Sequence, residues 1–357
     1  MSSQIPDLPG GLALTIPLAI VILVVMVILH ELGHFIAAKR SGVKVLEFGI
    51  GWPPRLFGRT WRGTLYSLNA IPVGAFVRML GENDQAQAQN QAQDPDSFSA
   101  KPKRSRALIL VAGSAMNLLL APVLFSASAL ISDFDSVEIT GVAPGSPAEA
   151  AGLRPGDRIE QVAGHEVDLP SDVGRIVLNN AGREIRLAID RNGAKLLVPI
   201  VPRRTHPADE GPLGVSIRPH LAPAPFTKAL ARGFTRTAEA VVLVPAFILD
   251  LISGSVGLEE VSGPVGIVDA VGQAARRGPE IVLLLAGYIT VQLAILNMLP
   301  WPGLDGGRLL LLGLEALRGG RRLPAAQEGT INILGILLLL MLVALVTVGD
   351  VRRIAGG

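Results

Sequence analysis

The chain has 357 residues, of which 49% are hydrophobic, 17% charged and 4% aromatic, with a mean hydropathy of +0.46. It contains no cysteine, which excludes disulfides, thiol metal ligands and a cysteine nucleophile, and a net charge of +2 is too small to indicate nucleic-acid binding. This composition favours a polytopic α-helical membrane protein of about four transmembrane helices that carries one small soluble domain.

The first apolar run predicts a transmembrane helix from Ile16 to Ala38. At 1.5 Å per residue it would measure about 34 Å, enough to cross a bilayer. Residues 1–11 contain no Lys or Arg, so the run lacks the basic start of a signal peptide. We therefore expect a retained helix, with Pro17 in its first turn.

Inside this run stands the sequence His30-Glu31-Leu32-Gly33-His34. Histidines four residues apart project from one face of a helix and can share a Zn²⁺ ion, with the intervening Glu31 as general base. Ionisable side chains in hydrocarbon are costly unless they have a partner or a function. The alternative is that both histidines only form hydrogen bonds between helices and satisfy a buried Glu31.

The segment 39–106 is predicted to form a strand-rich, membrane-associated loop. Gly and Pro punctuate β-branched and aromatic residues from Glu47 to Leu80, which indicates short strands and turns. The polar stretch from Gly81 to Ser99 is expected to be a flexible loop tip. Eleven Lys and Arg residues place the segment on the cytoplasmic side. Both termini would then lie outside.

Three more apolar runs have the length of membrane spans: Ala107–Ile131, Ile281–Trp301 and Ile331–Val348. The region from Pro225 to Pro279 is helical in pattern but contains Pro245 and Asp250. We expect it to lie at the membrane surface or on the bundle rather than to cross the bilayer.

Between the second and third spans the pattern changes to that of a small soluble domain. It predicts a strand, a short helix ended by Gly152, a second strand, a capped helix in "SDVGRIVLNNAG" and a hairpin turning at Asn192-Gly193. The stretch "GSPAEAAGLRPGDRI" resembles a circularly permuted bacterial PDZ domain, and Gly211–Ile217 is a weak match to its carboxylate-binding loop. The predicted divisions are an N-terminal membrane half (1–136), a PDZ domain with its exit strand (137–220) and a C-terminal membrane half (221–357).

A zinc site with two histidines needs a third protein ligand. The remaining histidines lie in or just after the soluble domain: His165, His206 and His220. A carboxylate is therefore more plausible, and Asp305 follows the third span at the side that His30 also approaches. Asp250, Asp269 and Glu315 compete with it, but none stands at such a break. Alternatively, Asp305 is only a turn or cap residue before two glycines.

The paired motifs "HELGH" and "NMLPWPGLDGG", with a PDZ domain between spans two and three, resemble the site-2 protease family. The nearest branch includes the bacterial regulator of sigma-E protease, and the resemblance extends from about Ile16 to Val348. It implies zinc-dependent proteolysis inside the membrane, with His30, His34 and Asp305 as zinc ligands and Glu31 as general base. Asn297 would contact the substrate backbone or the developing oxyanion, or else only bond between helices.

The stretches "SGPVGIV" (Ser262–Val268) and "NAIPVGAFVRMLGE" also match the family, in which the latter loop re-enters the membrane and pairs with the substrate as an added strand. The chain differs in having Ala75 where a second Gly is common, Ser114 where "GPxxN" has Pro, and one PDZ domain rather than two. These differences bear on substrate gating and choice.

The resulting hypothesis is an intramembrane zinc endopeptidase for single-span membrane proteins, such as anti-sigma factors or signal-peptide remnants, acting in regulated intramembrane proteolysis. It would reside in the inner (cytoplasmic) membrane, with its active site toward the cytoplasm and the PDZ domain outside. Expected partners are the substrates, the bilayer and a peptide C-terminus, without nucleic acid. The alternative is a catalytically silent PDZ scaffold. A metal transporter would need repeated ligand sites, and the spans contain one set.

Overall fold

The computed structural model describes residues 11–82, 94–207, 210–257, 260–321 and 324–355. The chain divides into two compact units, one formed by residues 1–126 and 230–357, the other by 127–229. We call them the membrane unit and the inserted unit. The predicted soluble domain, 137–220, lies within the inserted unit. Most of the predicted flexible loop tip, residues 83–93, lies outside the described residues.

In the part of the chain that the structure describes, four helices are long and apolar enough to cross a membrane: α1 (Gly11–Arg40), α3 (Lys103–Ile131), α8 (Pro279–Asn297) and α10 (Ala325–Ala355). They correspond to the four predicted spans. The first begins at Gly11 rather than Ile16, so Pro17 lies inside α1 rather than in its first turn. The third ends at Asn297 rather than Trp301, because the prolines that follow disfavour helical backbone before them.

Three further helices belong to the membrane unit wholly or in large part: α6 (Phe226–Ser253), α7 (Pro264–Arg277) and α9 (Asp305–Leu317). The predicted helical region 225–279 therefore consists of two helices. The "SGPVGIV" stretch starts α7, where the backbone N–H of Gly266 donates to the buried carboxylate of Asp350 on α10 (2.8 Å). The separate helix α9 was not predicted, and Asp305 is its first residue.

The strand-rich segment forms two antiparallel strands, β1 (Val45–Trp61) and β2 (Thr64–Met79). Arg62 and Gly63 both have positive φ (48° and 77°), as a tight two-residue hairpin turn requires. Both strands are bent. Residues 45–50 of β1 pair with the start of β2 along one edge and with the end of β2 along the other. The hairpin thus folds into four shorter segments, in keeping with the short strands that were predicted. The short 3₁₀ helix η1 (Phe98–Ala100) follows before α3.

The inserted unit is an antiparallel sheet with two helices. Its strands are β3 (Asp133–Val142), β4 (Arg158–Val162), β5 (His165–Glu166), β6 (Ile185–Arg191), β7 (Ala194–Ile200) and β8 (Val215–Ala222). Their order is β7-β6-β4-β3-β8, and β5 pairs with β4. The helices are α4 (Pro147–Ala150) and α5 (Pro170–Asn179), and the core contains the fully buried Val137, Ile139, Ile159, Leu187 and Ile189.

Local signals predicted most of this unit. The β6–β7 hairpin turns at Asn192 and Gly193, both with positive φ, and the Ser146 hydroxyl caps α4 by accepting from Glu149 N–H (3.2 Å). The prediction of a capped second helix was wrong in one respect. Helix α5 begins at Pro170, and the preceding residue, Leu169, makes no side-chain cap hydrogen bond. Proline at the first helical position needs no N–H acceptor.

Candidate active site

Two ligand-type side chains from α1 and one from α9 converge in the membrane unit. The Nε2 atoms of His30 and His34 lie 3.1 Å apart, and they lie 3.1 and 3.2 Å from Oδ2 of Asp305. The three ligand atoms are all within 4.8 Å of one another, as binding of one metal ion requires. Both histidines are buried (6% exposed), and Asp305 is partly buried.

The alternatives considered from the sequence do not join this group. Among the described residues the three-ligand group contains neither the other histidines nor the competing carboxylates Asp250 and Asp269. Glu315 instead accepts two hydrogen bonds from Arg106 (2.7 and 2.9 Å), and both side chains of this ion pair are buried. Asn297 is the last residue of α8 and partly buried, outside the three-ligand group.

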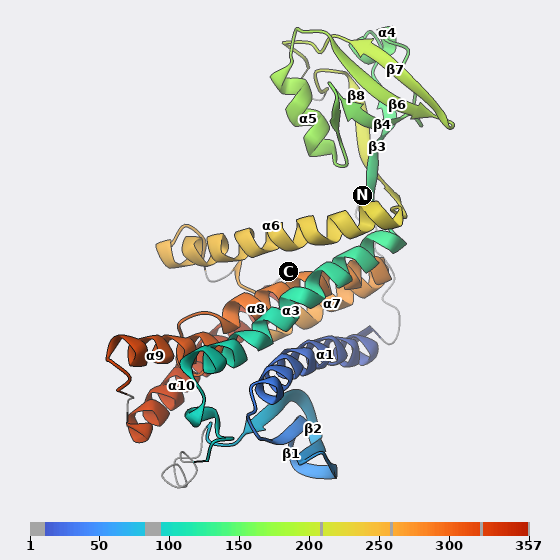
Figure 1. The fold of residues 1–357 in the computed structure, drawn as a ribbon. Coiled ribbons are helices and arrows are strands. Elements are labelled where there is room, and N and C mark those ends of the chain that lie inside the picture. The colour runs from blue at the N-terminus through green and yellow to red at the C-terminus, as the bar shows by residue number, and fades with distance from the viewer. Residues whose placement is uncertain (1–10, 83–93, 208–209, 258–259, 322–323, 356–357) are drawn as a thin grey trace. The chain divides into compact units, whose positions relative to one another are not determined.

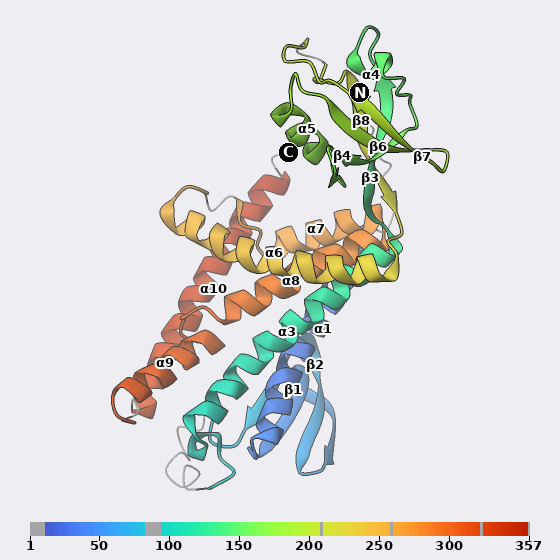
Figure 2. The same ribbon diagram turned by 45° about the horizontal axis from the view of Figure 1, so that its top comes forward.

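Helix α3 packs against the two histidines through a glycine. A Cβ atom on Gly113 would lie 2.4 Å from Nε2 of His34 and 2.7 Å from Nε2 of His30, so only glycine leaves room for the imidazoles here. Gly33 is equally tight, since its Cβ would stand 2.2 Å from the carbonyl oxygen of Ala112. Figures 1 and 2 show α1 and α3 running side by side. These glycines were not singled out from the sequence.

The backbone of α3 also orients one imidazole. Nδ1 of His34 donates to the carbonyl oxygen of Ile109 (2.7 Å), which leaves its Nε2 with a lone pair directed at Asp305 and His30. A second-nitrogen hydrogen bond of this kind is what fixes the tautomer of metal-binding histidines. Sequence spacing gave no signal for Ile109, because its carbonyl is a backbone group.

The end of β2 lies beside Glu31. The partly buried Glu31 carboxyl takes a backbone hydrogen bond from Val77, within the last residues of β2. Glu82, three residues after β2, forms an ion pair with Arg308, which stands one turn after Asp305 on α9. The strand-rich segment therefore contacts both the residue between the histidines and the helix that provides the carboxylate.

Helix α9 is fixed at its start by close backbone contacts. Added Cβ atoms would lie 2.3 Å from Met298 carbonyl atoms at Gly306, and 2.2 Å from the Trp301 carbonyl oxygen at Gly307. The two glycines after Asp305 thus let the first turn of α9 pack directly on the turn that follows α8. They serve packing that positions the carboxylate.

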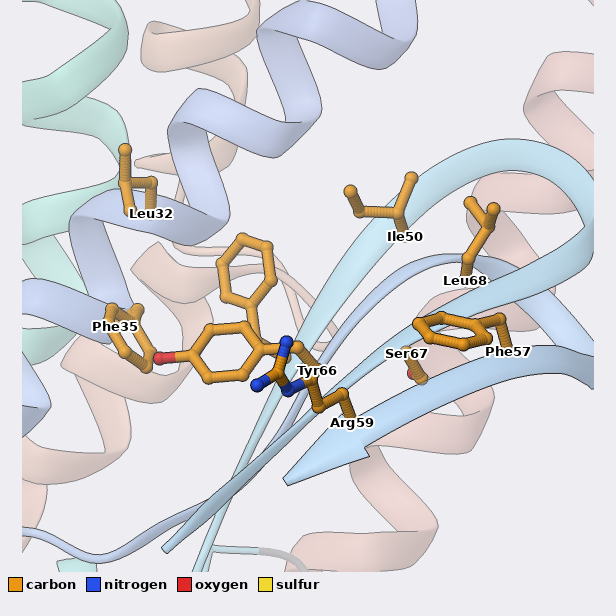
Figure 3. Close-up of a pocket in the computed structure, with 9 residues that line it drawn as sticks. Leu32, Phe35, Ile50, Phe57, Arg59, Tyr66, Ser67 and Leu68 are labelled. Carbon is orange, nitrogen blue, oxygen red and sulfur yellow. The ribbon is translucent and has the colours of Figure 1, made fainter. Parts of the chain in front are cut away.

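A separate apolar cavity lies between α1 and the β1–β2 hairpin (Figure 3). It measures about 310 Å³ and is lined by Leu32, Phe35, Phe48, Ile50, Phe57, Arg59, Tyr66, Ser67 and Leu68. Leu32 and Phe35 stand on the face of α1 turned away from the two histidines, since each residue advances 100° round a helix. This cavity is therefore distinct from the three-ligand group.

Two histidines on a helix long enough to cross a bilayer, with a glutamate between them and a carboxylate from a second helix at the same point, define a membrane-embedded metallopeptidase. Sequence comparison agrees: the model of peptidase family M50 matches residues 18–342. The chain belongs to that family. This membership confirms the predicted family and the predicted activity, that of a multi-pass membrane metalloendopeptidase that uses zinc.

Similar proteins come from several bacteria. A Clostridium acetobutylicum protein, provisionally described as a zinc metalloprotease, is 33% identical over 339 residues, which cover 94% of this chain and 97% of the relative. The zinc metalloprotease RasP of Oceanobacillus iheyensis is 28% identical, with 92% of this chain and 97% of the relative covered. RasP of Shouchella clausii is also 28% identical, with 94% and 98% covered.

Proposed function

We propose that His30, His34 and Asp305 hold one zinc ion and that Glu31 is the general base of an intramembrane endopeptidase. The observation that carries this proposal is the convergence of the three ligand atoms within 4.8 Å, although His30 and Asp305 are 275 positions apart. The donor set of two imidazoles and one carboxylate is one that zinc accepts, with a fourth position left open.

The residues around the three ligand atoms also fit a metal ion. Gly113 leaves the space in front of both imidazoles free of side chain, and Ile109 fixes His34 with Nε2 toward the site. Zinc held there supplies a Lewis acid that polarises the scissile carbonyl and acidifies water. Glu31 takes the proton from the attacking water and delivers it to the leaving amine, and the backbone N–H of Val77 orients its carboxyl.

Asn297 remains a candidate for substrate contact. It ends α8 eight residues before Asp305, where the chain turns toward α9. Its amide would donate to the substrate backbone or to the developing oxyanion, a role that suits a neutral donor near the reacting carbonyl. If it only bonds between helices, its replacement would change stability and leave kcat of the folded enzyme unchanged.

The substrates we propose are transmembrane segments of single-span membrane proteins, cut during regulated intramembrane proteolysis. Anti-sigma factors and signal-peptide remnants are examples of this class. The basic residues of segment 39–106 support an orientation with the active site toward the cytoplasm and both termini outside. The membrane would be the bacterial inner membrane.

The inserted unit has the element content expected of a PDZ domain, which we propose it to be. Its strand β8 begins at Val215, inside the Gly211–Ile217 stretch, and is an edge of the sheet, with one side paired to β3. An edge strand can accept an extended peptide as an added strand. The domain would bind a newly formed peptide C-terminus, or exclude substrates with large outer domains.

The experiment is cleavage of a tagged single-span substrate in membranes by wild type, Glu31→Gln and the matched control Glu239→Gln, whose side chain is exposed on α6. We expect cleavage by wild type and by the control, and none by Glu31→Gln, which keeps its zinc. Equal cleavage by all three would show that Glu31 is not the base. No cleavage by any of them, across a broad substrate panel, would favour the silent PDZ scaffold.

A further inference from the structure

Two buried polar groups near the three-ligand group have no hydrogen-bond partner among the described residues. One is Nδ1 of His30, and the other is the side-chain amide of Asn117 on α3, of which neither the oxygen nor the nitrogen is paired. His30 is 6% exposed and Asn117 fully buried. Unpaired buried polar atoms are rare in folded proteins and costly in a low-dielectric interior, so each calls for an explanation.

Asn117 on α3 lies one helix turn beyond the level of His30 on the neighbouring α1. His34 on α1 donates to Ile109 on α3, and His30, one turn earlier on α1, faces Gly113, one turn later on α3. The two helices therefore run in opposite directions, so that residues earlier in α1 lie level with residues later in α3. Asn117 is the next residue on this stripe of α3, one turn beyond Gly113.

The direction of helical side chains brings the amide toward the histidine. A residue in a helix covers the surface over the turn that precedes its own Cα, so Asn117 extends over the turn of Gly113. Because Gly113 has no side chain, the space there is open to the imidazole of His30, whose Cε1 lies 2.7 Å from the Gly113 Cβ position. Nδ1 is bonded to that carbon.

We propose that Asn117 is a positioning residue of the metal site: when a metal ion is bound, its side-chain Oδ1 accepts a hydrogen bond from Nδ1–H of His30, a bond that would satisfy two groups left unpaired among the described residues. This bond keeps Nε2 of His30 free of a proton and directed at the metal, as the Ile109 carbonyl does for His34. Metal-ligating histidines almost always donate their other N–H to such an acceptor, and its loss typically weakens metal binding about 10- to 100-fold. The inference rests on the proposed role of His30 as a ligand.

The matched control is Ser114, the neighbour of Gly113 on α3. Its hydroxyl is also buried and unpaired among the described residues, but it is turned about 100° from Gly113 round the helix. Removing it deletes a buried polar group of the same helix turn without touching the acceptor proposed for His30.

The test measures zinc affinity of the full-length protein in detergent by competition with a chelator. All variants carry Glu31→Gln, so that turnover plays no part. Asn117→Ala and Asn117→Leu should bind zinc about 10- to 100-fold more weakly than the parent. Asn117→Asp, which keeps an acceptor oxygen, and Ser114→Ala should keep the parent's affinity. Cobalt loaded in place of zinc should show altered visible absorption in Asn117→Ala and Asn117→Leu, and not in Asn117→Asp or Ser114→Ala.

Three results would overturn the proposal: unchanged zinc affinity in Asn117→Ala, an equal loss in Ser114→Ala, or an equal loss in Asn117→Asp, since the last would show that an acceptor oxygen at this position does not support zinc binding. If Asn117→Leu does not fold, the Ala and Asp variants decide between these outcomes. A parent protein that binds no zinc, or whose zinc is unaffected by Asp305→Asn, would overturn the proposed site as a whole. Failure of the proposed site can be told apart from failure of the Asn117 proposal, because it appears in the parent protein, in which Asn117 is unchanged.

Discussion

Replacing Gly113 by alanine should separate helix stability from metal binding. The added Cβ would lie 2.4 Å from Nε2 of His34, whereas ordinary contacts of a Cβ begin near 3.4 Å. The imidazoles would have to move by about 1 Å, several times the roughly 0.2 Å tolerance of metal–ligand distances. Separating the helices would relieve the overlap only by giving up the direct packing of Gly33 on the α3 backbone.

The same substitution should favour the helix itself. Alanine in a helix interior is more favourable than glycine by about 0.5–1 kcal/mol. We therefore expect metal-free Gly113→Ala to unfold no earlier than wild type, while its zinc affinity falls at least about tenfold, which corresponds to about 1.4 kcal/mol. Cleavage of a single-span substrate should fall with it.

The assay compares zinc content and affinity with the unfolding midpoint in the presence of a chelator. The control is Gly313→Ala on α9, where an added Cβ meets nothing within 4 Å. This control should gain helix stability and keep its zinc. Wild-type zinc affinity and cleavage in Gly113→Ala would refute the reasoning that the glycine makes room for the ligands.

Three further predictions concern packing and charge. Gly33→Ala should destabilise the protein by about 1–3 kcal/mol, because its Cβ would meet an α3 carbonyl at 2.2 Å; an unchanged unfolding midpoint would contradict this. Glu315→Leu should cost about 3–5 kcal/mol by leaving the buried Arg106 unpaired, and Arg106→Leu added to it should recover most of that loss; additive losses would show that the pair is not coupled. Burial alone would raise the pKa of Asp157, but hydrogen bonds from Arg191 (2.7 Å) lower it, so its stabilising effect is present at neutral pH and lost as pH falls through the lowered pKa. Protection factors of amide hydrogen exchange within 127–229 of the intact protein, corrected for the intrinsic exchange rate at each pH, should therefore fall on acidification, and less steeply in Asp157→Asn; parallel pH profiles would contradict the assignment.

The sequence alone was informative about the residues of the candidate site. His30, Glu31 and His34 follow a spacing that one helix turn explains, and hydrocarbon around them makes a structural role expensive. Asp305 required an argument about which side of the membrane two distant segments share, and the structure brings its carboxylate to the histidines. The four apolar helices could also be predicted from the sequence, because length and hydropathy are local properties.

What could not be predicted depends on contacts between elements. Gly113 is one of 40 glycines, and only the packing of α1 on α3 shows that it lies against the imidazoles. The carbonyl of Ile109 has no side-chain signature. Helix α9 was not predicted, because its 13 residues are too few to form a span and Asp305 begins it only after a proline-containing turn.

The separation of the ligands along the chain has a consequence for biosynthesis. His30 and Asp305 are 275 positions apart, and at about 5–20 residues per second a ribosome needs roughly 15 to 55 s to travel between them. During that interval the nascent polypeptide already holds the two histidines and Glu31, but no third ligand. Under the proposed ligand assignment, a newborn protease is inert toward neighbouring proteins until synthesis has passed α9, and a fragment that lacks α9 stays inert.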